Sequence, residues 1–534
     1  MGEQFTPAEE MLLKRFVTSV DSDVFCLINL PEVIKGALFS RYSRTTKSLR
    51  RLLIDEFINN PDLGLSHAKA EAGTDALAVQ KAEGFYERIL DGYGDDSVGE
   101  LGGVHIALES ISNIATKFVQ DSRIGGSPLE KSSRYVWFNK KVGGEYQFCK
   151  EPTLIATTYG KDYVAVNQLL FETYDELIEP MQEYFRERVP QDKETPDQAY
   201  NFSIRARACD ALRGLLPAST LTNMGVFGNG RFFEYLLIKL RASGLAELQD
   251  LADKMQRELE KVIPSFVRRA KPDHRHFSPA AAFLKTQRDT MVTWANQHTK
   301  PEPVTTGPTV TLVDYDKDGE EKVLATLLYA ASDTSLQTLR TVAKHLSPKD
   351  RAAIIADAIG LRSNRRHKPP RAFENAYYTF EITTDFGAYR DLHRHRILTQ
   401  ERQLLTTMHG YDVPHEIVDA GFADKWHACM HAADKTYKNI VKTHPYEAQY
   451  VVPFAYNVRW YVTANARSLY WLCELRATPQ GHPAYRLVAQ RMFSAINNVH
   501  PLLFSHAVVD MNDYALGRLQ AETKLAQKKT KEDA

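Results

Sequence analysis

The amino-acid sequence predicts an α+β protein that consists of two tandem units. Apolar residues recur at helical spacing over three long stretches, which predicts helices at 169–189, 245–267 and 484–496. Apolar and polar residues alternate over 376–384, and this alternation is typical of a half-buried strand. The sequence therefore contains the signals of both long helices and a sheet.

Both halves of the chain show the same order of signals. Each has a strand and an early helix, then a sheet segment that runs into a helix with an arginine. A long helix that ends in Leu-Arg-Ala follows, at 240–242 in one half and 475–477 in the other. A tripeptide match is weak by itself, but its repeated position near the end of each half predicts an internal duplication.

The chain is too long for one ordinary core, since it has 534 residues. Helical periodicity fades at about 270–308, where prolines and glycines accumulate, and part of this stretch is predicted to be a linker. We therefore place one unit in 1–300 and the second in 308–520. Residues 521–534 are charged and aperiodic, and are expected to form a frayed helix or a solvated tail.

Composition excludes several classes of protein. Apolar residues make up 43% and charged residues 25%, which is typical of a soluble globular protein. The formal net charge is zero, so no global positive field favours a nucleic-acid partner. Five scattered cysteines without a C-x-x-C pair indicate reduced thiols, not disulfides or zinc. The apolar stretch 24–39 is too short and too polar to span a membrane, and no export signal is evident, so we expect a cytoplasmic protein.

A dense cationic segment, Arg-Asp-Leu-His-Arg-His-Arg at 390–396, follows the predicted strand. A helix here would bring Arg390, His393 and Arg394 onto one stripe. Such a cluster repels itself unless an anion or a polar ring lies among the cations. A solvated basic face is the alternative. Metal binding is disfavoured, because His393 and His395 would face different sides of a helix and lack a further ligand at suitable spacing.

A second arginine-rich segment, 452–476, combines aromatic residues with Arg459, Arg467 and Arg476. Asn465 lies eleven residues before Arg476, which puts the two on nearly the same helix face, about 16 Å apart along the axis. Burying three guanidinium groups costs free energy unless a ligand or a partner compensates. Pairing with carboxylates across a helix interface is the structural alternative.

The stretch 122–135 is predicted to be a loop, because Gly125, Gly126 and Pro128 interrupt regular structure. Its backbone N–H groups, serine hydroxyls and Arg134 would suit a phosphate. The stretch contains neither a Walker loop nor a G-x-G-x-x-G motif, so an ordinary surface turn is the alternative.

Together these segments resemble the flavin-dependent (complementing) thymidylate synthase family. The family's signature is Arg-His-Arg followed after seven or eight residues by a serine and then Arg-Tyr. A His-x-Thr-Pro-Phe-Glu-type motif lies upstream, and Asn-Ala-Arg-Ser and Leu-Arg-Ala lie downstream. The matching residues in the second half are His367, Glu374, Arg394, His395, Arg396, Ile397, Arg459, Asn465, Arg467 and Arg476. The resemblance covers most of 308–510 and implies small, mostly antiparallel sheets with long packed helices.

The two halves depart from the family in complementary places. In the second half, 397–407 stands where the serine and Arg-Tyr belong. In the first half, Asp-Ser-Arg at 121–123 replaces Arg-His-Arg, and Asn223 stands where the second half has Arg459. The first half keeps the lost loop at Glu130, Ser132 and Arg134. The resemblance thus identifies the first half as a degenerate copy.

Active sites in this family are shared between subunits of a homotetramer, so the resemblance implies one composite site. The second half would bind FAD through His367, Glu374, Arg394, His395, Arg396, Ile397, Asn465 and Arg467. The nucleotide would be bound by Arg459 and Arg476, together with Glu130, Ser132 and Arg134 of the first half. Two chains would then form a homodimer that is a pseudo-tetramer.

The activity implied by the resemblance is methylation of deoxyuridylate, or a related uridine nucleotide, at C5. Methylenetetrahydrofolate is the carbon donor, reduced FAD supplies the hydride, and NADPH reduces the flavin. The expected catalytic residues are Arg476, which would hold the uracil and stabilise charge on its carbonyl oxygens, and Ser132, which would orient the nucleotide. The alternative is a decayed or repurposed flavin- or nucleotide-binding protein. The motif set disfavours a helical scaffold.

Overall fold

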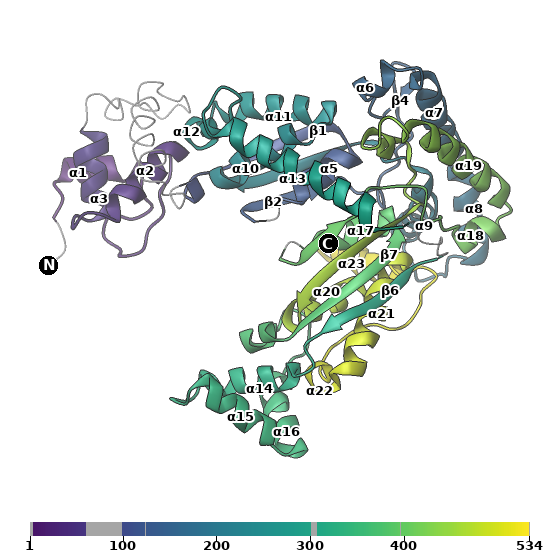
Figure 1. Ribbon diagram of the computed structural model, residues 1–534. Helices are drawn as coiled ribbons and strands as arrows, with labels where there is room; N and C mark the ends of the chain where they lie inside the picture. The colour runs from purple at the N-terminus through teal and green to yellow at the C-terminus, as the bar shows by residue number, and fades with distance from the viewer. Residues whose placement is uncertain (1–3, 60–98, 123, 301–306, 396, 533–534) are drawn as a thin grey trace. The chain divides into compact units, whose positions relative to one another are not determined.

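The computed structural model describes residues 4–59, 99–122, 124–300, 307–395 and 397–532. It combines many helices with small antiparallel sheets, which confirms the α+β class (Figure 1). Unit 1 comprises Met1–Glu109, Asp121–Glu130 and Asn223–Pro301. Unit 2 comprises Ser110–Gln120, Lys131–Thr222 and Glu302–Ala534. Unit 2 therefore contains segments from both halves of the sequence.

A three-stranded sheet in the order β1-β5-β2 lies mostly in unit 1. Strand β2 pairs antiparallel with β5, with Gly126 opposite Gly228 and Glu130 opposite Met224. The strands are β1 (Gly103–Ser112), β2 (Gly126–Glu130) and β5 (Leu221–Asn229). The helical elements are α1 (Pro7–Leu13), α2 (Glu32–Tyr42), α3 (Leu49–Leu52), η1 (Leu53–Ile58), α10 (Gly230–Ala242), α11 (Ala246–Leu259), α12 (Pro264–Val267), η6 (Arg268–Ala270) and α13 (Phe277–His298).

Unit 2 has a four-stranded antiparallel sheet in the order β6-β7-β9-β8. Its β7 pairs with β9 from Tyr377 opposite Asn465 to Asp385 opposite Asn457. The apolar side of β7 is completely buried, which confirms the strand predicted from alternation. The strands of unit 2 are β3 (Lys141–Val142), β4 (Glu145–Tyr146), β6 (Thr309–Tyr315), β7 (Tyr377–Asp385), β8 (Thr399–Arg402) and β9 (Asn457–Asn465).

The helices of unit 2 pack around this sheet and around each other. Helix α20 begins directly after β9, because the Asn465 side chain accepts a hydrogen bond from the Ser468 N–H and caps the first turn. From the first half come α5 (Asn113–Gln120), α6 (Pro152–Ile155), α7 (Gly160–Glu176), α8 (Ile178–Arg188), α9 (Asp197–Leu212) and η5 (Arg213–Leu215). From the second half come α14 (Gly319–Tyr329), α15 (Leu336–His345), α16 (Pro348–Ile359), η7 (Arg371–Asn375), α17 (Phe386–Leu392), α18 (His415–Asp419), α19 (Ala423–Ile440), η8 (Glu447–Val451), α20 (Ala466–Arg476), α21 (Pro483–Val499), α22 (Pro501–Phe504) and α23 (Leu519–Glu532).

The two halves of the sequence meet inside unit 2 through pairs of backbone contacts. Pro217 and Pro453, which precede β5 and β9 respectively, form an antiparallel bridge with each other. The two prolines are 236 positions apart in the sequence.

The hydrogen bonds that flank this bridge also occur in pairs with the same spacing of 236 positions. The Ala218 N–H donates to the Val452 carbonyl at 2.9 Å, and the Phe454 N–H donates to the Leu216 carbonyl at 2.9 Å. Ala218 and Phe454 are 236 positions apart, and so are Leu216 and Val452, so the two bonds have the same donor and acceptor positions with the halves exchanged. A second exchanging pair runs from Ser219 to Tyr450 at 3.0 Å and from Ala455 to Gly214 at 2.9 Å.

Three local predictions differ from the structure. The helix predicted over 169–189 is broken between α7 and α8, because a proline ring clashes with the carbonyl four residues earlier and Pro180 thus ends α7 at Glu176. The predicted loop around Gly126 contains strand β2, which is held by pairing with β5. The predicted linker contains the 22-residue helix α13. The C-terminal segment, for which a frayed helix and a solvated tail were the two alternatives, contains most of helix α23.

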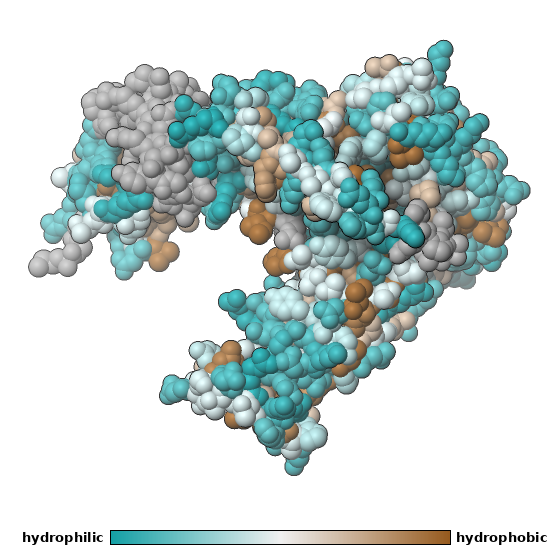
Figure 2. Space-filling model, in the orientation of Figure 1, coloured by the Kyte–Doolittle hydropathy of each residue, from teal (hydrophilic) through white to brown (hydrophobic). Residues whose placement is uncertain are grey.

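The face of the molecule that Figure 2 shows is mostly hydrophilic, with scattered apolar residues. Over the described part of the chain, no helix is both long enough and apolar enough to cross a membrane. All five cysteines are free thiols. Within the same described ranges, no group of three or more His, Cys, Asp and Glu side chains could hold a metal ion.

Candidate functional site

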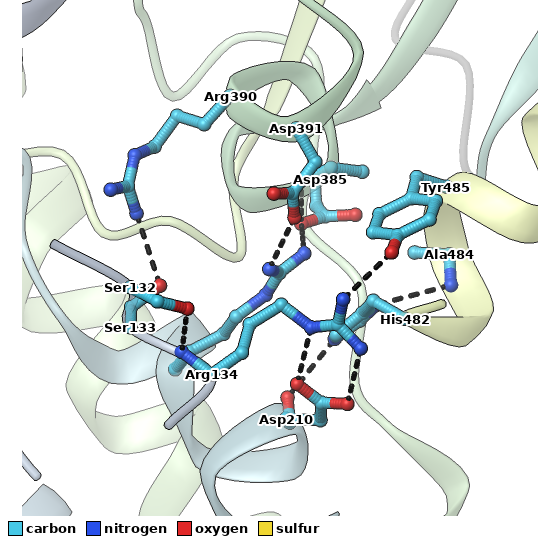
Figure 3. Close-up of polar contacts among 12 residues, drawn as sticks. Ser132, Ser133, Arg134, Asp210, Asp385, Arg390, Asp391, His482, Ala484 and Tyr485 are labelled. Atoms are coloured by element: carbon cyan, nitrogen blue, oxygen red, sulfur yellow. Dashed lines mark hydrogen bonds and ion pairs between the residues drawn. The ribbon is translucent and has the colours of Figure 1, made fainter. Parts of the chain in front are cut away.

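Arg134 forms the centre of a buried polar cluster in unit 2 (Figure 3). Its Nε and Nη2 donate to the two carboxylate oxygens of Asp210 at 2.8 and 3.0 Å, which is a bidentate ion pair. Its Nη1 donates to the Tyr485 hydroxyl at 2.7 Å, and Nη2 also donates to the Gln480 carbonyl at 3.0 Å. Arg134 from the first half is thus bound to residues that follow α20 in the second half.

The carboxylate of Asp210 is stabilised in its ionised form. Burial alone would raise the pKa of Asp210, but the Arg134 guanidinium outweighs this and holds that pKa below its usual range. Arg518, which precedes α23, adds a second cation 3.5 Å from Asp210 and lies over the ring of Tyr135. Asp210 therefore occupies the position at Arg134 that an external anion would take.

Helix α17 contributes a second carboxylate, Asp391, to the same cluster. Asp391 accepts a hydrogen bond from Arg213 Nη1 at 2.9 Å, and Arg394 Nη2 lies 3.8 Å from its other oxygen. Burial would raise the pKa of Asp391, but Arg213 and Arg394 hold it well below its usual range. Asp391 therefore remains charged and ties the start of the Arg-His-Arg motif to the first half.

Arg476 meets the middle residue of that motif at the C-terminal end of α20. Its Nε donates to His395 Nε2 at 2.9 Å, and its guanidinium lies 5.7 Å from the centre of the Tyr485 ring. Because an arginine N–H can only donate, His395 accepts at Nε2 and carries its proton on Nδ1. Burial and the adjacent Arg476 lower the pKa of His395 well below its ordinary value, so the ring is neutral.

Burial is the main influence on Arg476. It lowers the pKa of this guanidinium; Asp391 and Tyr485 oppose the shift, while Arg394 and Arg134 add to it. Burial disfavours the charged form of an arginine, so this guanidinium would be stabilised by an anion or by a ring whose carbonyl oxygens gain negative charge.

Two further contacts join the halves beside this cluster. Arg390 Nη1 donates to the Ser133 hydroxyl at 3.2 Å (Figure 3). His393 Nδ1 lies 3.2 Å from Gln120 Oε1. Helices α5 and α17 begin in the same way. The Ser112 hydroxyl accepts a hydrogen bond from the backbone N–H three residues later, and the Asp385 carboxylate does the same. Gln120 and His393 hold equivalent positions in these helices and contact each other.

The predicted nucleotide loop has three distinct environments. Ser132 accepts a hydrogen bond from the backbone N–H of Arg134 at 3.2 Å, which folds the loop locally. Arg134 is buried in the cluster described above. Glu130 lies in β2 of unit 1, where it is buried opposite Met224. Arg459 lies half-buried in β9, opposite Thr383 of β7.

Several predicted flavin residues gather at the N-terminal end of α20. Arg467 Nη1 donates to Glu374 at 2.9 Å, and its Nε donates to the Pro369 carbonyl at 2.7 Å. Asn465 caps the same helix end. His367 is exposed and lies two residues before Pro369 in the sequence. The predicted set is therefore divided between the two ends of α20.

Arg394 and His395 of the Arg-His-Arg motif lie at the other end of α20, near Arg476. Ile397 is 91% exposed, and Arg396 lies outside the described residues. Arg394 Nε is buried and has no hydrogen-bond partner among the residues that the structure describes. An unpaired buried donor of this kind fits a carbonyl or phosphate oxygen of a cofactor such as FAD.

Sequence reasoning missed the residues that complete the cluster. They are Asp210, Arg213, Asp391, His482, Tyr485 and Arg518. Asp210 and Arg213 are three residues apart at the end of α9, a spacing that puts them on one helix face. Tyr485 follows Leu-Arg-Ala by a few residues. These spacings were visible in the sequence, but nothing local distinguishes them from ordinary helix surface.

The fold and the paired arginine motifs define a class for this chain. The chain belongs to the thymidylate synthase complementing protein family, whose model matches residues 49–265 and 311–502, one stretch in each half. It is 47% identical over 523 residues to a UPF0159 protein of Chlamydia pneumoniae, covering 97% of this chain and 98% of that one. The family expected from the motifs is thereby confirmed.

Two further similarities are more distant. A flavin-dependent thymidylate synthase of Sulfolobus acidocaldarius is 28% identical over 213 residues, which cover 37% of this chain and 76% of that protein. Among solved structures, a UMP/dUMP methylase, PolB, from Streptomyces cacaoi bound with 5-Br dUMP matches with a TM-score of 0.29 and 19% identity. That match covers 38% of this chain and 97% of the other, and at this TM-score it carries no weight.

Proposed function

We propose that this chain methylates deoxyuridylate at C5 to form thymidylate, using methylenetetrahydrofolate as carbon donor and NADPH as reductant. The proposal is supported by family membership and by one observation above all. Arg134 from the first half and Arg476 from the second half both contact Tyr485 within unit 2. Arg134, from the loop that only the first half keeps, and Arg476, from the second half, therefore contact the same side chain.

Arg476 is the proposed contact to the uracil ring. Its guanidinium is oriented by His395, which is neutral and accepts at Nε2. A guanidinium held in place before the reaction stabilises charge that develops on a ring carbonyl oxygen, without reorganisation cost. Arg459 and Ser132 are proposed as further nucleotide contacts, and Glu130 completes the loop that the resemblance implies.

Arg134 is the proposed phosphate ligand, and Asp210 then acts as its internal substitute. Four hydrogen bonds tie the Arg134 guanidinium to protein groups, and two of these go to Asp210. Phosphate would exchange with this carboxylate at Arg134. After the exchange, Asp210 would keep Arg518, 3.5 Å away, as its remaining cation.

FAD is the proposed cofactor, and it supplies the hydride when bound in its reduced form. Arg394 fits the group through its unpaired buried Nε, as stated above for the described residues. His395 and Arg396 are proposed to bind beside it, with Ile397 against the ring system. At the other end of α20, Arg467 and its neighbours His367, Glu374 and Asn465 are proposed to bind a second part of the cofactor.

The chain is proposed to be a tandem duplication that forms a homodimer equivalent to a tetramer. The exchanging hydrogen bonds around Pro217 and Pro453 support this, since a residue contacts its own counterpart only across a two-fold axis. The contact between Gln120 and His393 repeats the relation at a separate place. The native mass of the purified chain tests the dimer directly.

The first experiment is tritium release from C5-labelled deoxyuridylate by the purified, FAD-loaded chain. We expect release that depends on methylenetetrahydrofolate and NADPH. Arg476→Ala should reduce the rate by about 100-fold or more, because one preorganised donor to a developing oxyanion is worth that factor. Arg186→Ala, at a partly exposed arginine in α8, is the matched control and should leave the rate unchanged. Unchanged release in Arg476→Ala would refute its assignment.

A repurposed nucleotide- or flavin-binding protein is the second candidate, and the ion pair between Arg134 and Asp210 favours it. If that pair is purely structural, Arg134 does not bind phosphate. Calorimetric titration with deoxyuridylate separates the two candidates. Arg134→Ala should weaken nucleotide binding and leave the flavin absorption spectrum intact under the proposal. Loss of flavin with unchanged nucleotide binding would contradict the composite site.

A further inference from the structure

A cavity of about 170 Å³ lies in unit 2 beside the arginine cluster. Its apolar wall includes Trp426 of α19, whose side chain is completely buried, and Pro414. Neither Arg134 nor Arg476 is among its lining residues. An engineered apolar cavity of about 150 Å³ accommodates benzene, so this one has room for a small planar ring.

Two carboxyl groups face this cavity without a matched cation for each. Burial raises the pKa of Asp412 to about 6, and Asp385 raises it further, while the amide of Asn457 opposes the shift. Burial also raises the pKa of Asp385, although Arg213 opposes it. Raised values at two neighbouring acids mean that their charges are poorly compensated. They favour a ligand that brings N–H donors.

Three buried N–H donor atoms, from two residues that line this cavity, lack acceptors among the described residues. Arg213 uses Nη1 for Asp391, but across the described residues its Nε and Nη2 have no hydrogen-bond partner, and Asp385 Oδ1 is 3.9 Å from Nη2. The indole N–H of Trp426 is likewise unpaired within the described ranges. Buried donors without partners cost free energy, and they call for an acceptor such as a carbonyl oxygen.

We propose that this cavity binds a small planar heterocycle whose edge combines an amino group and a ring N–H with a carbonyl, the arrangement found in isocytosine and guanine. The N–H groups would donate to the carboxyl groups of Asp385 and Asp412, and the carbonyl would accept from Arg213. The ring faces would lie against the apolar wall that includes Trp426. Arg207 and Glu416 also line the cavity, but they pair with each other and leave this edge unopposed.

The site shares Asp210, Arg213 and His482 with the arginine cluster, but neither Arg134 nor Arg476 lines it. Asp412 and Trp426 belong to neither the arginine cluster nor the predicted motifs. The orphan donors and the raised acids lie on the wall of one cavity, although they come from η5, α19, the cap of α17 and the segment before α18.

The test is calorimetric titration of the full chain with isocytosine. The wild-type chain should bind it, and Asp412→Asn should weaken binding at least tenfold, because a hydrogen bond to a charged group is lost. Asp424→Asn, an exposed carboxylate in the first turn of the helix that carries Trp426, should bind normally. Excess deoxyuridylate should not displace isocytosine. Titration with guanosine shows whether the ligand is a nucleoside or a free base. Guanosine that binds as tightly as isocytosine assigns a nucleoside, and guanosine that binds more weakly assigns a free base.

Three results would overturn the proposal. The first is no heat of binding for the wild-type chain at millimolar isocytosine while deoxyuridylate still binds. The second is displacement of isocytosine by deoxyuridylate. The third is toluene binding as tightly as isocytosine, with no effect of Asp412→Asn. If Asp412→Asn does not fold, Ala484→Leu provides the second variant, since it fills the cavity from α21 and should abolish binding.

Discussion

Replacing Asp412 by asparagine should stabilise the protein at neutral pH and have little effect at acidic pH. The pKa of this carboxyl group rises from 3.8 to about 6 on folding. An acid with a raised folded pKa contributes stability that is complete below its unfolded pKa and is lost as pH rises through the folded value. For Asp412 the window of loss is roughly pH 4 to 6.

The magnitude follows from the shift. A difference of about 2 pKa units corresponds to about 3 kcal/mol, and partial solvent access makes this an upper limit. Asparagine keeps the shape of the side chain and cannot ionise, so it removes the cost that wild type bears at pH 8. Asp412→Asn should therefore unfold at a midpoint a few degrees higher than wild type at pH 8.

Thermal unfolding midpoints at pH 4.5 and pH 8 provide the assay. A chain with two units does not unfold in two states, so the midpoints are compared directly and not converted into free energies. Asp424→Asn is the control, because its carboxyl group is exposed. An identical shift of the midpoint at both pH values, or destabilisation at pH 8, would refute the reasoning that burial and Asp385 raise the pKa of Asp412.

Three other perturbations follow from the cluster. Gly387→Ala should destabilise unit 2 by about 1–3 kcal/mol, because the new Cβ would lie 2.9 Å from both Arg213 Nε and Asp385 Oδ1. Thermal unfolding measures this effect, and Gly225→Ala is the control because the space around its Cβ is open. Asp391→Asn should lower the free energy of unfolding by about 3–5 kcal/mol at pH 7. The loss should be smaller as pH falls below about 4, because Asp391, whose pKa is lowered, contributes stability only while it is ionised. Urea unfolding midpoints measured as a function of pH test this. Tyr485→Phe removes the hydrogen-bond partner of Arg134 Nη1 and should weaken deoxyuridylate binding about tenfold, as measured by calorimetry. An unchanged affinity would mean that Tyr485 is not part of the nucleotide site.

The elements that sequence predicted best are those with one buried face. In β7, Tyr378, Phe380 and Ile382 are completely buried, and this one-sidedness produces the alternation that sequence shows. Helix α13 has no buried residue at all, so it has no apolar stripe to detect. Strand β2 was missed for a different reason, since Gly125 and Gly126 favour a turn locally and pairing with β5 overrides them.

The candidate site was predictable only as far as its motifs extend. Arg134, His395 and Arg476 were identified from the resemblance, and the structure brings all three into one unit. Asp210 lies 76 residues from Arg134 in sequence, within an otherwise ordinary helix, so its role depends entirely on tertiary packing. The same holds for the cavity beside Asp412, because its walls come from segments that no sequence window contains together.

The two-fold contact at Pro217 and Pro453 has a consequence for how such a protein can change. In a homodimer every substitution appears on both sides of the axis, so a residue lost from one side is lost from the other. If the chain is the tandem duplication proposed above, its two sides are encoded separately, and the partner is always present at the effective concentration set by the connecting chain. Each side would then be able to specialise, and a defect in one copy would be complemented within the same molecule without a second gene product.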